Sequence, residues 1–176
     1  MNFQTAVKTC FSKYVTFSGR AARSEYWWFF LFGILGSLVA AILDGVLFGA
    51  ATVQTEVTDT SASASAVSNG PIASIFSLAI LLPQLSVGWR RMHDTGRSGV
   101  FLLYPLLVMV GISMFLAFFG SFGTGVDGGL SGTVAVITGL AVFVLAISPL
   151  IVLWWLTRPS QPGANAYGPN PHEVSP

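Results

Sequence analysis

Residues 27–48 read WWFFLFGILGSLVAAILDGVLF and contain one charged residue, Asp44. A helix needs about 20 mainly apolar residues to cross the roughly 30 Å of hydrocarbon in a bilayer. The segment therefore predicts a membrane-spanning helix. The whole chain agrees, because 53% of its 176 residues are hydrophobic, only 9% are charged and its mean hydropathy is +0.71. A soluble domain has about 25% charged residues, so the composition argues against a water-soluble globule.

Three further segments have the length and apolar character of a span: residues 71–88, 100–119 and 134–155. The first of these is the shortest, but its start is well marked because Pro71 suits the first turn of a helix. We therefore expect an all-α integral membrane protein with four transmembrane helices.

The basic residues are confined to alternate connections between the expected spans. They occur in the N-terminal segment, in the loop between the second and third spans and in the tail: Lys8, Lys13, Arg20, Arg23, Arg90, Arg91, Arg97 and Arg158. The other two loops, residues 49–70 and 120–133, contain none. Because basic loops remain in the cytoplasm, we expect both termini to lie there.

The N-terminal segment has an amphipathic helical pattern. One face of residues 2–15 carries apolar side chains: Phe3, Val7, Cys10, Phe11, Tyr14 and Val15. Such a helix lies in the membrane interface, and the alternative is that its apolar stripe packs on the protein's own spans. The expected organisation is an interfacial segment over residues 1–26, a four-span membrane domain over 27–156 and a cytoplasmic tail over 157–176.

Three sequence blocks outside the spans are similar to one known family. They are FSGR with RSEYW at residues 17–20 and 23–27, RRMHDTGRSG at 90–99, and NAYGPNP at 165–171. In these blocks the chain resembles the YhaH-like family of small bacterial inner-membrane proteins, although Met92 stands where that family usually has leucine. The resemblance implies the bacterial inner (plasma) membrane and the same topology, and it supplies no activity.

Charged side chains in these blocks suggest structural ion pairs. We expect Glu25 to pair with Arg90 or Arg91, and Asp94 to pair with Arg20 or Arg23. Partly buried pairs of this kind fix a loop against a helix, since loss of one partner leaves an unpaired charge.

A second hypothesis makes the same blocks a ligand site. The planar fork of arginine suits phosphate oxygens, and basic pockets at a membrane surface recruit anionic lipids. The candidate ligand-binding residues are Arg20, Arg23, Arg90, Arg91, His93, Asp94 and Arg97. We expect a structural or regulatory binding protein whose partners are membrane lipids, with an anionic phospholipid head group as the simplest ligand.

Other classes of function have less support. Although His93 lies next to Asp94, no activated nucleophile accompanies them, so no catalytic residue is predicted. Neither a metal site nor a cofactor is expected, because His172 is isolated and Cys10 is the single cysteine. The net charge of +1 gives no reason to expect nucleic acid.

A small-solute transporter or channel acting as a homo-oligomer remains the alternative. Transport requires polar groups at membrane depth. Asp44 lies near the outer end of the first span, where we expect it to reach the surface.

The tail is rich in proline and glycine, and we expect Tyr167 to dock against the loop of residues 90–99.

Overall fold

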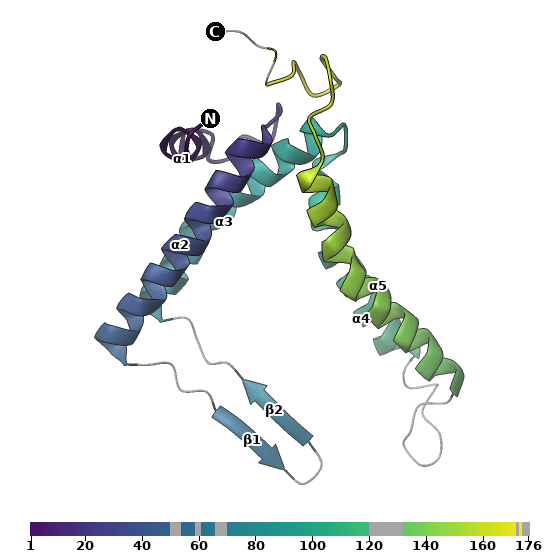
Figure 1. Cartoon of the computed structure of the whole chain (residues 1–176). Helices are drawn as coiled ribbons and strands as arrows, with labels where there is room; N and C mark the ends of the chain where they lie inside the picture. Colours follow the sequence, from purple (N-terminus) through teal and green to yellow (C-terminus); the bar gives the residue numbers. More distant parts are fainter. Residues whose placement is uncertain (50–53, 59–60, 66–69, 120–131, 172, 174–176) are drawn as a thin grey trace. The chain divides into compact units, whose positions relative to one another are not determined.

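The computed structural model describes residues 1–49, 54–58, 61–65, 70–119, 132–171 and 173 (Figure 1). The chain divides into two compact units. The first contains Met1–Thr16 and Ser24–Val87, and the second contains Phe17–Arg23 and Gly88–Pro176.

The first unit contains helices α1 (Phe3–Ser12) and α2 (Arg23–Phe48) and most of α3 (Pro71–Asp94). The side chain of Asn2 caps α1, because its oxygen accepts a hydrogen bond from the amide of Thr5 at 2.8 Å. The apolar stripe of α1 contacts α2, with Phe3 against Trp28 and Phe11 against Phe29 at ring-centroid distances of 5.9 and 5.6 Å. This packing corresponds to the second of the two expectations for the N-terminal helix.

Hydrogen bonds hold the residues after α1 against α3. Pro83 has no amide hydrogen and therefore leaves the carbonyl of Ala79 without its helical partner. The hydroxyl of Tyr14 donates to that carbonyl at 2.5 Å. Ser86 donates to the carbonyl of Thr16 at 2.7 Å. The proline in α3 thus creates an attachment point for the N-terminal segment.

Asp44 caps the start of α3. Its carboxylate accepts hydrogen bonds from the amides of Ile72 at 3.0 Å and Ala73 at 2.8 Å, and the residue is only 5% exposed. The expectation that Asp44 reaches the surface is therefore wrong. The free amide groups and positive dipole end of α3 stabilise a carboxylate inside the protein.

A two-stranded antiparallel sheet lies between α2 and α3 in the sequence. Strand β1 (Gln54–Thr58) pairs with β2 (Ser61–Ser65) so that Glu56 is opposite Ser63. The expected all-α class therefore describes the long helices correctly, but it does not include this β-hairpin. Residues 54–58 are rich in β-branched threonine and valine, which favour strands.

The second unit contains the 3₁₀ helix η1 (Gly99–Leu103) and the helices α4 (Tyr104–Phe119) and α5 (Gly132–Thr157). Helices α4 and α5 pack side by side (Figure 1). Pro149 within α5 leaves the carbonyl of Leu145 unpaired by the backbone, and the hydroxyl of Ser148 donates to it at 2.9 Å. This bond lets α5 continue through its proline.

Three helices in the described part of the chain are long and apolar enough to cross a membrane. They are α2, α3 and the Ala135–Thr157 part of α5. Three of the four expected spans are thereby confirmed as candidates by length and composition, with α2 starting at Arg23 and α3 extending to Asp94. Helix α4 is apolar but has 16 residues, which is short for a span.

Candidate functional site

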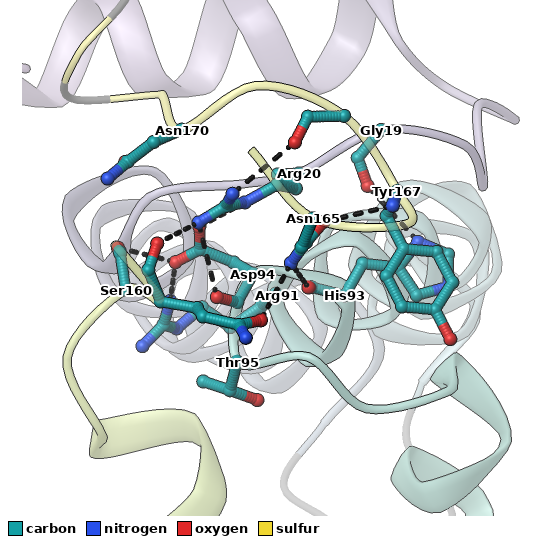
Figure 2. Close-up of polar contacts among 12 residues, drawn as sticks. Gly19, Arg20, Arg91, His93, Asp94, Thr95, Ser160, Asn165, Tyr167 and Asn170 are labelled. Atoms are coloured by element: carbon teal, nitrogen blue, oxygen red, sulfur yellow. Dashed lines mark hydrogen bonds and ion pairs between the residues drawn. The ribbon is translucent and has the colours of Figure 1, made fainter. Parts of the chain in front are cut away.

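Asp94, the last residue of α3, is the centre of a buried polar cluster in the second unit (Figure 2). Its carboxylate accepts from Nε of Arg20 at 3.0 Å, from the guanidinium of Arg91, and from the hydroxyl of Ser160 at 2.5 Å. We call these four residues, Arg20, Arg91, Asp94 and Ser160, the clasp. The clasp joins the segment before α2, the end of α3 and the tail.

Arg20 connects the carboxylate to the backbone of the tail. Its guanidinium donates to the carbonyls of Gln161 at 2.6 Å and Gly163 at 2.7 Å. The residue is 8% exposed. One charged fork therefore satisfies several backbone carbonyls, which is the geometry that favours arginine over lysine.

Arg91 caps the end of α5. Its Nε donates to the carbonyl of Leu156 at 3.0 Å, and a terminal nitrogen donates to the carbonyl of Arg158. Carbonyls at the end of a helix lack helical partners and carry the negative end of its dipole. The buried cation of Arg91 is thus stabilised both by Asp94 and by α5.

The tail folds over the end of α3. The ring of Tyr167 stacks on that of His93 with centroids 3.8 Å apart and planes 5° from parallel. The side-chain amide of Asn165 donates to the carbonyl of His93 at 2.9 Å, while Nδ1 of His93 lies 3.1 Å from the carbonyl of Gly19. The expected docking of Tyr167 against residues 90–99 is confirmed.

A pocket of about 280 Å³ lies beside the clasp. Its lining comes from the loop after α3 and from the start of the tail: Thr95, Arg97, Arg158, Pro159, Ser160, Gln161 and Pro162. Among the described residues, no carboxylate forms an ion pair with Arg97 or Arg158. Burial, together with repulsion from Arg158, lowers the pKa of Arg97. Within the described ion pairs, the two guanidinium groups that line the pocket therefore have no carboxylate partner.

Indole rings support both of these guanidinium groups. Arg97 lies over Trp155 at 5.2 Å from the ring centroid, and Arg158 lies over Trp154 at 5.0 Å. Cation–π contacts of this kind fix the direction of an arginine without neutralising it. The charge of both side chains stays available to a ligand.

Three further residues that the sequence predicts for a ligand site or an ion pair lie outside both the clasp and the pocket lining: Arg23, Glu25 and Arg90. Arg90 is 1% exposed, and its carbonyl accepts from the amide of Ala21 at 3.1 Å. Arg23 is exposed at the start of α2. Glu25 is buried in the first unit, 4.0 Å from the sulfur of Cys10. Its pairing with Arg90 or Arg91 would link the two units and stays a prediction.

Arg158, Ser160 and Gln161 belong to the site although the three sequence blocks and the charge pattern do not indicate them as site residues. In the charge pattern, Arg158 indicates only the topology. One further sequence pattern could have indicated Arg158 as a site residue. Trp154-Trp155 followed by Arg158-Pro159 places a cation at a helix end beside two indole rings. Within the described ranges, no group of three or more histidine, cysteine or acidic residues has the arrangement of a metal site.

Comparisons with known proteins agree on one family. The chain is 32% identical to the inner membrane protein YhaH of Escherichia coli over 105 residues, which are 60% of this chain and 75% of YhaH. It is 32% identical to the inner membrane protein YhaI of the same organism over 113 residues, 63% of this chain and 79% of YhaI. No solved structure is significantly similar. The family DUF805, described as proteins of unknown function, matches residues 14–169, and the chain is therefore a membrane protein of that family.

Proposed function

We propose that this protein binds an anionic phospholipid head group at the cytoplasmic face of the inner membrane. Arg97 and Arg158 are the proposed cationic ligands. The observation that carries the proposal is the charge balance around the pocket. In the described ion pairs, Arg20 and Arg91 share one carboxylate, that of Asp94, and no carboxylate pairs with Arg97 or Arg158 in the pocket lining. A bound phosphate would offset part of the excess positive charge.

The tryptophans support a lipid as the source of the phosphate. Trp154 is 57% exposed at the end of α5, and exposed tryptophans at the ends of spans settle at the depth of lipid head groups. Since Arg158 lies over that indole, we expect its guanidinium to lie at the depth of lipid phosphates in the proposed topology.

The candidate residues then divide into two roles. Arg20, Arg91 and Asp94 build the frame, because their charged groups already bind each other and backbone carbonyls. Arg97 contacts the ligand together with Arg158. Arg23 and Arg90 are proposed to add positive potential to the same face, whereas His93 supports the tail through its stack with Tyr167.

The proposed topology has four spans with both termini in the cytoplasm. Helix α4 contributes about 24 Å at 1.5 Å per residue. The five residues of η1 add about 10 Å, so the two elements together match the roughly 30 Å of a bilayer. The basic residues then lie on one side, as the positive-inside rule requires. Residues 1–26, 27–156 and 157–176 remain the proposed interfacial, membrane and tail regions.

Lipids that co-purify with the full-length protein test the proposed function. We expect the wild type to retain phosphatidylglycerol, and Arg97→Ala/Arg158→Ala to retain at least about 100-fold less, since it loses two charge-assisted contacts of about 1.5–3 kcal/mol each. The variant Lys8→Ala/Lys13→Ala is the matched control, because it removes two exposed basic residues from the first unit.

Equal retention of phosphatidylglycerol by all three proteins would refute the site. Inorganic phosphate that displaces the lipid completely at equal concentration would refute the assignment to a lipid and indicate a soluble phosphate ligand.

A further inference from the structure

We propose that docking of the tail and binding of the anion are thermodynamically linked, because the tail forms one wall of the pocket. This inference rests on the proposed function and adds its regulation. Thr95 and Arg97 line the pocket from the loop after α3, and residues 158–162 line it from the tail. A tail that leaves the clasp takes Ser160, Gln161 and Pro162 out of the pocket wall.

Contacts that place this wall come from the clasp. Ser160 donates to the carboxylate of Asp94, and the amide of Gln161 donates to the carbonyl of the same residue at 2.9 Å. Arg20 donates to the carbonyl of Gln161 at 2.6 Å. Ser160 and Gln161 are thus fixed by Asp94 and Arg20, which do not line the pocket themselves. Asp94 therefore acts as a positioning residue for the pocket.

The tail approaches the loop closely at Gly96. A Cβ atom at this position would lie 2.6 Å from Oε1 of Gln161. Gly96 also has a φ of +73°, a conformation that glycine adopts without strain. The loop therefore has a shape that accepts the docked tail.

A second set of contacts, which lies outside the pocket, holds the tail against the end of α3. Tyr167 stacks on His93, and Asn165 donates to the carbonyl of His93. Neither Tyr167 nor Asn165 lines the pocket. A change at Tyr167 therefore alters tail docking without removing a ligand contact, which allows the linkage to be measured separately from the charge of the site.

Linkage is reciprocal: if docking raises the affinity for the anion by some factor, the anion raises the docking equilibrium by the same factor. Typical couplings between sites correspond to about 5- to 150-fold. We therefore expect the anion to protect the tail from hydrogen exchange, and loss of the Tyr167 stack to weaken binding of the anion.

The test uses the full chain in nanodiscs of phosphatidylcholine alone or mixed with phosphatidylglycerol. Hydrogen exchange is followed in peptides that cover residues 160–170. In the wild type we expect exchange to slow about tenfold when phosphatidylglycerol is present. Arg97→Ala/Arg158→Ala should show no response. Tyr167→Ala should exchange faster and bind phosphatidylglycerol about tenfold more weakly, whereas Tyr167→Phe, which keeps the stacked ring, should behave as the wild type.

The outcomes separate the two proposals. If Tyr167→Ala exposes the tail yet binds phosphatidylglycerol as tightly as the wild type, the linkage is wrong and the lipid site stands. If phosphatidylglycerol slows exchange equally in the wild type and in Arg97→Ala/Arg158→Ala, the protection does not come from this pocket and the linkage is again wrong. If the wild type does not bind phosphatidylglycerol, the proposed function itself fails.

Discussion

The two ends of α3 hold buried carboxylates in different ways. At the start of α3, Asp44 is bound by the amides of Ile72 and Ala73. At its end, Asp94 is bound by Arg20, Arg91 and Ser160. The first carboxylate uses the dipole and free amides of a helix, whereas the second uses full opposite charges. The difference indicates that the first is a local cap and the second organises several segments of the chain.

The largest expected effect comes from Asp94→Asn. This change leaves the guanidinium groups of Arg20 and Arg91 buried without their anion, and breaking a buried ion pair costs about 3–5 kcal/mol. We expect a loss of that size in the free energy of unfolding, measured by denaturant titration in detergent micelles. Arg20→Gln combined with Asp94→Asn should recover part of the loss, and a double variant as unstable as the sum of both changes would argue against the pair.

A smaller effect is expected from Asp44→Asn. Asparagine still offers an oxygen to the amides at the start of α3, and loss of a helix cap costs about 0.5–2 kcal/mol. In the same denaturant titration, we therefore expect Asp44→Asn to have a clearly higher free energy of unfolding than Asp94→Asn. The opposite ranking would mean that the comparison between the two ends of α3 is wrong.

The change Tyr14→Phe should have an effect of similar or smaller size. It removes the hydrogen bond to the carbonyl of Ala79 that Pro83 leaves unpaired, and a single hydrogen bond contributes about 0.5–1.5 kcal/mol. Pro83→Ala in the same background should restore the helical partner of Ala79 and cancel the loss. A full loss that persists in the double variant would show that the hydroxyl acts elsewhere.

The smallest effect on stability is expected from Arg97→Ala/Arg158→Ala. Neither side chain belongs to the clasp, and removal of two cations that repel each other costs no ion pair in the described contacts. We expect the free energy of unfolding, measured by thermal denaturation in lipid-free micelles, to change by less than about 1 kcal/mol. A change of that size is typical of exposed sites. A loss comparable to that of Asp94→Asn would make these residues part of the frame.

Patterns carried by one segment were predictable from the sequence. Apolar runs predicted the positions of α2, α3 and α5, because a bilayer demands a long continuous stretch. The pairing of Asp94 with an arginine from residues 20–23 was also foreseeable, since a lone acid among basic residues has few other partners. The docking of Tyr167 followed from the resemblance of three separate blocks to one family.

Features that depend on the packing of distant segments were not predictable. The position of Asp44 near the end of an apolar run predicts that it reaches the surface, because the amides that bind it belong to a separate segment at the start of α3. The role of Arg158 depends on how the tail returns to the end of α3, which composition does not encode. The hairpin of β1 and β2 was missed because a short polar segment rich in serine and threonine is also typical of a flexible loop.

The most direct test of the account is a titration of the full chain in nanodiscs with phosphatidylglycerol, followed by native mass spectrometry. The account predicts saturable binding by the wild type, at least about 100-fold weaker binding by Arg97→Ala/Arg158→Ala and unchanged binding by Lys8→Ala/Lys13→Ala. Equal affinities for the wild type and Arg97→Ala/Arg158→Ala would contradict it.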